Sequence, residues 1–326
     1  MGIVVVTDHV FPHLDVERQI LRAAGHELRY ERDLRDPGEI VAAAADADAL
    51  LNCYSPVPAE VIERLRRCRI IARYGIGLDT IDIPAATGRG IVVTNVPDYC
   101  IDEVSDHALA LILALVRGIG RLDRSVRGGG WDPMVARPLH RIRGRVLGLV
   151  GFGRIARRLA EKASVIGFEI LATDPFVADE AIRAAGVRPA DLNALMSESD
   201  VVSVHAPMTD ENRHLIGGRE LGLLRDGAML VNTSRGPLVD LDALRAELET
   251  GRLGGAALDV LEREPPVPGD PLLHRDDVLI TPHAAFYSEE SMAEQQRKAA
   301  EQVVAALAGQ VPPYAVNADV IGPGRP

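Results

Sequence analysis

Short apolar runs rich in β-branched residues alternate with segments of helical periodicity along the whole chain. Runs of this kind, without polar alternation, are typical of strands buried on both faces of a parallel sheet. The helical segments between them supply the crossovers that parallel strands require. The pattern therefore predicts an α/β protein with doubly wound parallel sheets. The predicted strands are Ile3–Val6, Glu27–Tyr30, Ala49–Asn52, Arg69–Arg73, Ile91–Thr94, a strand from Val146, Glu169–Thr173, Val201–His205, Ala228–Asn232, Ala256–Val260 and Val278–Thr281.

The order of these elements predicts two domains, because five strands with their helices complete one sheet before a second begins near Val146. A last helix follows the second sheet, so we expect residues 1–98 and 288–326 to form a discontinuous first domain. Residues 99–287 form the second domain. We expect ligands in a cleft between the two, and disorder at Gly322 to Pro326. The predicted helices are Val16–Ala24, Glu39–Ala45, Ala59–Arg66, Ile83–Thr87, a long helix from Asp102, Ile155–Val165, Asp191–Met196, Arg219–Leu224, Asp240–Glu249 and Met292–Leu307.

A glycine-rich turn follows the strand at Val146 and opens the next helix, in the pattern Gly-x-Gly-x-x-Ala. Gly151 permits a tight turn, Gly153 lets the backbone approach a pyrophosphate, and Ala156 lets helix and strand pack closely. The next predicted strand ends at Asp174, whose carboxylate suits the ribose hydroxyls and would repel a 2′-phosphate. The second domain is therefore predicted to be a Rossmann domain that binds NAD in preference to NADP.

Composition narrows the function. The chain of 326 residues has a net charge of −11, which argues against a nucleic-acid or lipid-headgroup surface. The most apolar helical stretch, Val104–Val116, is too short to cross a bilayer. Cys53, Cys68 and Cys100 have no metal-ligand spacing, so we expect buried thiols in a cytoplasmic protein and no metal site.

Three further motifs lie at the carboxyl ends of predicted strands. One carries Arg235, another carries Asp259, Glu262 and Glu264, and the third carries His283. Separately, an arginine is most often solvated, and acidic residues after a strand are often turn residues. Together they supply an anion clamp, a carboxylate and an imidazole.

In these motifs the chain resembles the D-2-hydroxyacid dehydrogenase family, from about Ala49 to Asn317. The motifs that carry the resemblance are the fingerprint, Arg73-Tyr74-Gly75-Ile76-Gly77-Leu78-Asp79, His205-Ala206-Pro207, Asn232-Thr233-Ser234-Arg235-Gly236, Leu258-Asp259-Val260 with Glu264-Pro265, and Thr281-Pro282-His283. The resemblance implies that the first domain is a flavodoxin-like substrate domain. It also implies a hydride transfer between NAD(H) and a D-2-hydroxy or 2-oxo acid.

The resemblance assigns roles residue by residue. His283 corresponds to the acid/base, Glu264 to its carboxylate partner and Arg235 to the substrate-binding arginine, which makes Glu262 the weaker candidate. Such a histidine exchanges a proton with the substrate oxygen, and the planar guanidinium clamps a carboxylate. The predicted cofactor contacts are Gly151, Phe152, Gly153, Arg154, Ile155, Asp174, His205, Pro207, Thr233, Ser234 and Asp259. The predicted substrate contacts are Tyr74, Gly75, Ile76, Gly77, Arg235 and Phe286.

The substrate remains open at this stage. Residues 283–289 resemble the branch of the C-terminal-binding-protein corepressors, which places Phe286 as an aromatic wall and suggests a larger or apolar 2-oxo acid. Phosphoglycerate dehydrogenases are also similar, but the loop at residues 52–56 is neutral here and leaves Arg73 as a possible phosphate contact. Glu264 argues against formate dehydrogenase chemistry, where a glutamine is expected.

The second function in play is an NAD(H)-responsive interaction protein with weak or no turnover. The complete set of Arg235, Glu264 and His283 favours the enzyme. We also expect a homodimer built through the NAD-binding domains, partly from the helix at Val104–Val116 and the segment around Trp131.

Overall fold

The computed structural model describes residues 1–320, so the disorder predicted for Gly322 to Pro326 lies outside the described residues. The chain divides into two compact units. The first contains Met1–Cys100 and the chain from Ser288 onward, and the second is Ile101–Tyr287. Each unit contains one wholly parallel sheet, which confirms the predicted α/β class with two doubly wound sheets.

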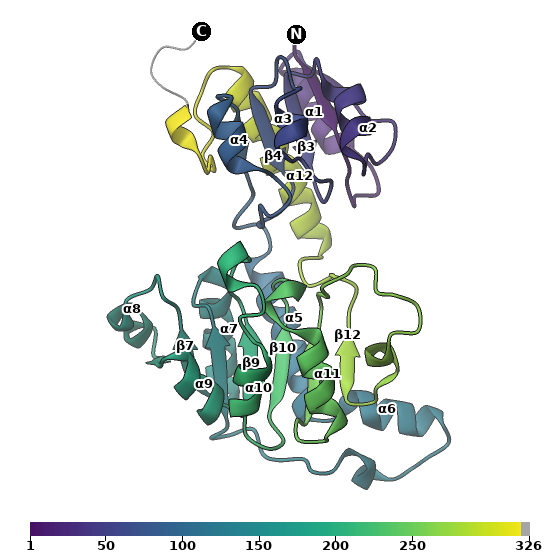
Figure 1. Cartoon of the computed structure of the whole chain (residues 1–326), viewed down its shortest axis with the longest axis vertical. Coiled ribbons are helices and arrows are strands. Elements are labelled where there is room, and N and C mark those ends of the chain that lie inside the picture. The colour runs from purple at the N-terminus through teal and green to yellow at the C-terminus, as the bar shows by residue number, and fades with distance from the viewer. Residues whose placement is uncertain (321–326) are drawn as a thin grey trace. The chain divides into compact units, whose positions relative to one another are not determined.

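The sheet of the first unit has the strand order β2-β1-β3-β4-β5, the arrangement typical of flavodoxin-like folds. Helices α1 and α12 cover one face, while α2, α3 and α4 cover the other (Figure 1). The strands are β1 (Ile3–Val6), β2 (Glu27–Arg29), β3 (Ala49–Asn52), β4 (Ile70–Arg73) and β5 (Val92–Thr94). The helices are α1 (Asp15–Ala23), α2 (Pro37–Ala44), α3 (Ala59–Ile62), α4 (Ile83–Gly88), α12 (Glu289–Leu307) and the 3-10 turn η5 (Ala318–Val320).

The sheet of the second unit has the order β12-β11-β10-β9-β6-β7-β8, which is the Rossmann order with one strand added. Its strands are β6 (Val146–Val150), β7 (Glu169–Thr173), β8 (Arg188–Pro189), β9 (Val201–Val204), β10 (Met229–Asn232), β11 (Gly255–Leu258) and β12 (Val278–Ile280). Its helices are α5 (Ile101–Val116), α6 (Ile119–Arg127), α7 (Arg154–Ile166), α8 (Asp179–Ala184), α9 (Leu192–Glu198), α10 (Gly218–Leu223) and α11 (Leu241–Glu249). The 3-10 turns are η1 (Pro133–Ala136), η2 (Asp210–Asn212), η3 (Gly236–Leu238) and η4 (Pro271–His274).

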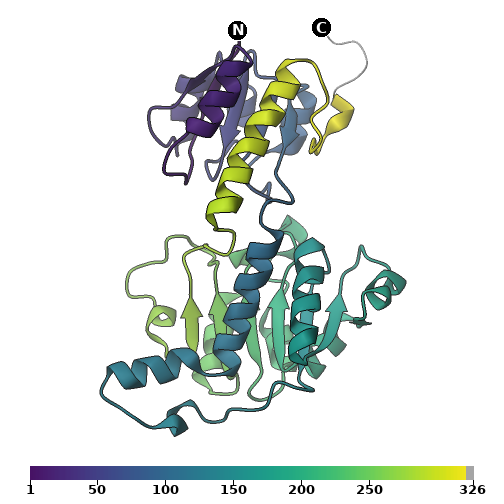
Figure 2. The same cartoon turned by 180° about the vertical axis from the view of Figure 1, so that it is seen from behind.

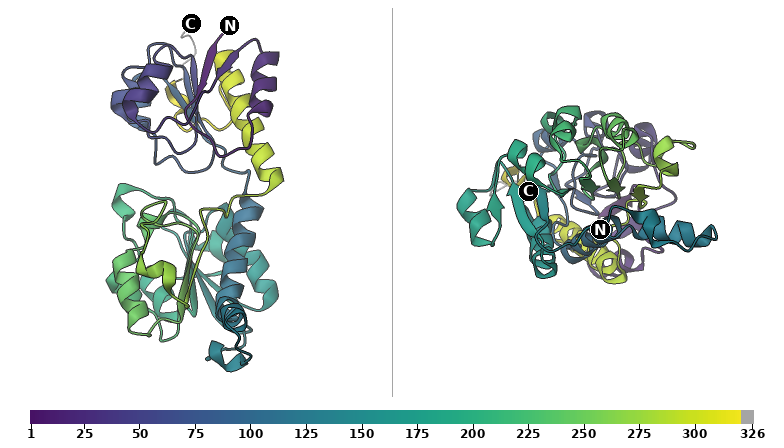
Figure 3. Two further views of the ribbon diagram at one scale, coloured as in Figure 1. Left: turned by 90° about the vertical axis from the view of Figure 1, so that its right-hand side faces the viewer. Right: turned by 90° about the horizontal axis from the view of Figure 1, so that it is seen from below.

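Helices cover both faces of this second sheet. Figure 2 shows α5 and α7 lying along one face, and the edge-on view in Figure 3 shows helices on either side of the strands. Two apolar clusters fill the space between sheet and helices. Leu147 and Leu149 pack toward α5 and α7, whereas Val150 packs toward α9 and α10. Both faces are therefore buried, which explains why these strands lack polar alternation.

Differences from the predicted elements are mostly of one residue at strand ends. The sequence pattern missed α6, α8 and the short strand β8. Helix α6 buries no residue, so no buried apolar stripe marks it. The predicted helix Ala59–Arg66 ends at Ile62 in α3. Within the described residues no helix is both long and apolar enough to cross a membrane.

The three cysteines are buried and form no disulfide. Burial raises the pKa of the Cys53 and Cys68 thiols to about 12, so both stay protonated at neutral pH. Across residues 1–320, no group of three or more His, Cys, Asp or Glu side chains has an arrangement that would hold a metal ion.

Candidate active site

The register of the second sheet places the ends of six neighbouring strands level with one another. Val150 pairs with Thr173 and with Val204. Val204 pairs in turn with Asn232, which pairs with Leu258. Leu258 pairs with Ile280. Each predicted motif of this unit begins just after one of these residues, so the fold brings the motifs to a single edge of the sheet, where open α/β sheets bind ligands.

The two fingerprint glycines serve different purposes. Gly151 has φ +92, and a Cβ there would lie 2.7 Å from the Ala206 backbone nitrogen, so folding itself requires glycine. Gly153 has a negative φ, and a Cβ there would meet no protein atom within 4 Å. Folding therefore does not require glycine at position 153, and the open space beside it fits the predicted approach of a pyrophosphate.

The first turn of α7 is also suited to an anion. Gly153 is its N-cap residue and offers no side-chain acceptor to the first amide groups of the helix. These N–H groups and the helix dipole favour negative charge. Arg154 and Ile155 are the first two residues of this helix, as the sequence predicts for pyrophosphate contacts.

Asp174 directly follows β7, and its carboxylate stabilises the glycine turn. One carboxylate oxygen accepts a hydrogen bond from Phe152 N at 2.8 Å, and the other accepts one from Phe176 N at 2.9 Å. Each oxygen can accept a second hydrogen bond, so a ribose can still be bound.

His205, at the end of β9, is a neutral group. Its Nε2 lies 2.9 Å from Ser203 Oγ. Burial lowers the pKa of His205 to about 4, so the imidazole is uncharged at neutral pH. Nearby, Ser234 Oγ donates to Ala206 O at 2.5 Å, which ties the loop after β10 to the residues before Pro207. Thr233 is buried, and its hydroxyl has no hydrogen-bond partner among the described residues.

His283 and Glu264 form the central pair of the site. His283 Nδ1 lies 2.7 Å from Glu264 Oε2, and the other carboxylate oxygen accepts from Leu261 N at 2.9 Å. Burial raises the pKa of Glu264, but the hydrogen bond and charge of His283 outweigh burial, and the net pKa is lowered. The carboxylate is therefore ionised and accepts, so the proton of this bond sits on Nδ1. Proton exchange is left to Nε2.

Arg235 lies close to this pair, since its positive charge also lowers the pKa of Glu264. Its Nη1 donates to Ser234 O at 2.9 Å. The buried Asn232 shapes the loop, because its Nδ2 donates to Arg235 O at 2.9 Å and its Oδ1 accepts from Ser234 N at 3.0 Å. The three predicted catalytic residues thus share one edge of the second unit.

Gly236 explains how two loops come this close. A Cβ at this position would lie 2.0 Å from the carbonyl carbon of Leu261 and 2.4 Å from Glu262 N. The backbone after Arg235 therefore passes directly against the backbone that leads to Glu264. Glu262 points elsewhere, since it pairs with Arg213 at 3.0 Å.

In the first unit, the loop after β4 presents amide groups and a buried cation. Gly75 has φ +125, and a Cβ there would lie 1.9 Å from Arg73 Nη1. Arg73 is 5% exposed, and its Nε has no hydrogen-bond partner among the described residues. The structure records no acceptor within residues 1–320 for the N–H groups of Gly75, Ile76 or Gly77. Such a loop suits an anion.

Two side chains differ in what they can offer a substrate. Tyr74 is 1% exposed, its hydroxyl donates to Glu17 at 2.8 Å, and its backbone N–H donates to Asn52 O at 2.7 Å, so both of its donors are used within the first unit. Phe286 is partly buried, with its ring edge-on to that of His283 at a centroid distance of 6.3 Å. Phe286 therefore forms a wall beside the imidazole.

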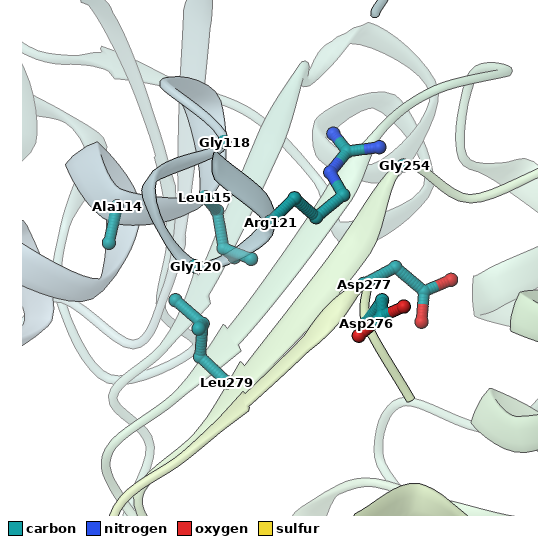
Figure 4. Close-up of a pocket in the computed structure, with 9 residues that line it drawn as sticks. All are labelled: Ala114, Leu115, Gly118, Gly120, Arg121, Gly254, Asp276, Asp277 and Leu279. Atoms are coloured by element: carbon teal, nitrogen blue, oxygen red, sulfur yellow. The ribbon is translucent and has the colours of Figure 1, made fainter. Parts of the chain in front are cut away.

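A pocket elsewhere in this unit contains none of the predicted residues (Figure 4). It is lined by Ala114, Leu115, Gly118, Gly120, Arg121, Gly254, Asp276, Asp277 and Leu279. Gly254 and Asp277 directly precede β11 and β12, so this pocket lies at the amino ends of the strands, opposite to the candidate site.

Sequence reasoning did not single out Asn232, His107 or Thr281 as working parts of the site. Thr281 Oγ1 donates to Asp259 Oδ1 at 2.6 Å, and His107 Nε2 lies 3.0 Å from the same hydroxyl. Thr281 and Asn232 lie in quoted motifs, but their contacts depend on strand register. His107 lies 174 residues before Thr281, and nothing in its local sequence pattern marks it as part of the site.

The chain is similar to proteins of one known family. Residues 109–285 match the family model "D-isomer specific 2-hydroxyacid dehydrogenase, NAD binding domain". The chain is 39% identical over 313 residues to a glyoxylate reductase of Korarchaeum cryptofilum, with 94% of each chain covered. It is 40% identical over 274 residues to a D-3-phosphoglycerate dehydrogenase of Archaeoglobus fulgidus, covering 84% of this chain but 52% of that relative.

Solved structures show the same fold. D-lactate dehydrogenase of Aquifex aeolicus, complexed with NAD and lactic acid, superposes with a TM-score of 0.85 at 28% identity, covering 99% of this chain and 100% of the other. A protein of Thermus thermophilus, TT0316, gives a TM-score of 0.87 at 34% identity, with coverages of 96% and 99%.

The contrast between the two fingerprint glycines gives a prediction. Gly153→Ala should fold with a free energy of unfolding within about 1 kcal/mol of the wild type. Its affinity for NADH should fall at least about tenfold, because the added methyl occupies the place of the pyrophosphate. Urea denaturation and NADH fluorescence titration measure the two quantities.

Gly222→Ala is the matched control, because a Cβ at this glycine of α10 also meets no atom within 4 Å. In the control, the NADH affinity should stay at the wild-type value, and the free energy of unfolding should change by no more than about 1 kcal/mol, because alanine favours the helix. Wild-type NADH affinity in Gly153→Ala would refute the assigned role of Gly153.

Proposed function

We propose that His283 is the acid/base and Arg235 the substrate clamp of this chain, which belongs to the D-isomer specific 2-hydroxyacid dehydrogenase family and is an NAD-linked oxidoreductase of 2-hydroxy acids. The hydrogen bond between His283 and Glu264 carries the proposal. The two side chains come from different loops, and their contact fixes both the orientation and the tautomer of the imidazole.

The proton moves through His283 Nε2. A bound nicotinamide supplies the hydride to the carbonyl carbon in one direction and accepts it in the other. During reduction, His283 gives its Nε2 proton to the oxygen on which negative charge develops. During oxidation, the neutral imidazole takes that proton from the hydroxyl. Glu264 stabilises the imidazolium form that precedes reduction and follows oxidation.

The substrate carboxylate is held by cations and amides. Arg235 offers a planar fork for the carboxylate and carbonyl oxygens. Gly75, Ile76 and Gly77 offer amide groups for the carboxylate, and the buried Arg73 adds positive charge to that loop. We assign the first unit to substrate binding on this basis. Binding of the substrate between the two domains, with closure that excludes water, stays a prediction.

The substrate is a small 2-oxo or 2-hydroxy acid. The glyoxylate reductases among the relatives match along almost the whole chain, whereas the chain spans about half the length of the phosphoglycerate dehydrogenase relatives. Glyoxylate is therefore the first substrate to test. Phe286 beside His283 favours apolar 2-oxo acids as further candidates, and Arg73 keeps a phosphorylated acid in the panel.

A protein that only senses NADH is the weaker alternative. Sensing does not require an ionised carboxylate bonded to an imidazole beside an arginine. Oxidation of NADH with any member of a panel of 2-oxo acids would exclude it. Tight NADH binding with no turnover across the panel would favour it.

His283 gives the sharpest prediction. His283→Asn should lower kcat at least about 1000-fold, because a proton donor is lost at the reacting oxygen, while NADH affinity stays unchanged. Stopped-flow turnover and fluorescence titration provide the two measurements. His274→Asn, a change on the exposed η4 turn, is the control and should behave as the wild type. Wild-type turnover in His283→Asn would remove His283 from the mechanism.

Asp174 predicts the choice between NADH and NADPH. Asp174→Asn keeps the size of the side chain and an acceptor oxygen, but it removes the charge that repels a 2′-phosphate. The ratio of kcat/KM for NADH to that for NADPH should fall at least about tenfold, a difference of about 1.4 kcal/mol. An unchanged ratio would show that Asp174 does not select the cofactor.

We propose a homodimer formed through the NAD-binding unit. The predicted helix, now α5, is largely buried in its own domain core, with Ile112 at 0% exposure. The support comes from the following segment, where α6 buries no residue and Trp131 is 89% exposed. Val126 and Met134 of the same segment are also exposed. The expected compartment, the cytoplasm, also stays a prediction.

Sedimentation equilibrium at micromolar concentration should give twice the chain mass of 35.1 kDa. Trp131→Glu should shift the protein toward the monomer, because a charge would have to be buried in the interface. A monomeric wild type would contradict the proposal.

A further inference from the structure

The backbone of His283 has a conformation that the residue does not favour by itself. Its φ is +51, and His214 is the other non-glycine residue with positive φ among the described residues. A left-handed backbone is unfavourable for a residue with a side chain, because Cβ comes too close to the following carbonyl oxygen. Such strain persists where surrounding contacts over-determine it, and it concentrates at functional sites. The contacts that hold this backbone therefore determine where the imidazole points.

Asp259 holds the backbone that follows His283. One carboxylate oxygen accepts from Ala284 N at 2.8 Å, and the other accepts from Ala285 N at 2.9 Å. The backbone carbonyl of Asp259 accepts from His283 N at 2.8 Å. The Asp259 side chain is 1% exposed, so water contributes little to its solvation. Its orientation depends on protein donors.

A two-residue chain of hydrogen bonds reaches Asp259 from α5. Thr281 Oγ1 donates to Asp259 Oδ1 at 2.6 Å, which uses the single proton of that hydroxyl. His107 Nε2 lies 3.0 Å from Thr281 Oγ1. Since the hydroxyl proton is already used, the imidazole is the donor and carries a proton on Nε2. This nitrogen is 3.6 Å from Asp259 Oδ1, close enough for a favourable electrostatic contact with the carboxylate.

We propose that His107 and Thr281 are positioning residues for the acid/base histidine. The hydrogen bonds from His107 to Thr281 and from Thr281 to Asp259 hold the Asp259 carboxylate in place. The carboxylate in turn holds the amides of Ala284 and Ala285, and so keeps His283 in its left-handed conformation. This inference rests on the proposed role of His283. It assigns function to two side chains that do not touch the His283 ring.

Removing the Thr281 hydroxyl tests the proposal. Thr281→Val keeps the shape of the side chain but removes its hydrogen bonds, and Thr281→Ser keeps the hydroxyl. We expect Thr281→Val to lower kcat about 10- to 100-fold, since a small misplacement of a catalytic group costs this much. The KM for the 2-oxo acid and the affinity for NADH should be unchanged. Thr281→Ser should recover kcat to within about threefold of the wild type, a residual loss of less than 1 kcal/mol.

His107 supplies the second arm. His107→Leu should lower kcat as Thr281→Val does, while His107→Gln, which retains an N–H donor, should restore part of the activity. The double variant Thr281→Val/His107→Leu should be no slower than the worse single variant, because both changes break one chain of contacts. Multiplicative losses would show that His107 acts independently of Thr281 and would overturn the proposed chain.

A readout independent of turnover separates this inference from the proposed function. Hydrogen exchange of the peptide that contains Ala284 and Ala285 should lose protection in Thr281→Val but not in Thr281→Ser. Wild-type protection together with a wild-type kcat would overturn the positioning role. A wild type without turnover would instead contradict the proposed function. The exchange experiment would still show whether Thr281 and Asp259 hold the amides of Ala284 and Ala285. Thermal melting of each variant identifies any loss of kcat that is due to unfolding.

Discussion

The hydrogen bond between His283 Nδ1 and Glu264 Oε2 is the contact on which the proposed chemistry of this protein depends. Because an ionised carboxylate only accepts, the bond fixes a proton on Nδ1, and in the proposed mechanism Nε2 exchanges its proton with the substrate. The same bond orients the ring. A histidine without such a partner would have no single ring orientation and no fixed tautomer. In the proposed mechanism, the pair makes His283 a proton donor with one defined reacting atom.

This contact is possible because of the parallel sheet that supports it. Asn232, Leu258 and Ile280 are paired across three neighbouring strands, so the loops that follow them leave the sheet at one level. Gly236 then lets two of these loops touch through their backbones. A one-residue change of register would turn the side chains of a strand to the opposite face and separate the motifs. The positions of catalytic groups are thus a consequence of strand pairing in the core.

The sequence predicted the parts of this arrangement that follow from local pattern. Both sheets, most helices, the glycine turn and the Arg235, Glu264 and His283 motifs could be found because apolar periodicity and motif spacing are local signals. Helix α6 was missed although its apolar residues, including Ile119 and Val126, have helical spacing; both are exposed, so this stripe does not belong to a core. The proposed substrate contacts and the proposed dimer interface involve surfaces that a single sequence does not pair with each other.

The local sequence pattern does not show which hydrogen-bond partner each buried polar atom has. Tyr74 belongs to a predicted substrate motif, yet its hydroxyl is committed to Glu17 in the core of the first unit. Asp259 is a predicted cofactor contact, and each of its oxygens also accepts from a backbone amide next to His283. In each case the residue is buried, and burial obliges its donors and acceptors to find partners within the protein. The hydrogen bonds of a buried polar residue therefore indicate its role in this protein: those of Asp259 end on the loop of the proposed acid/base, whereas that of Tyr74 ends in the core of the first unit.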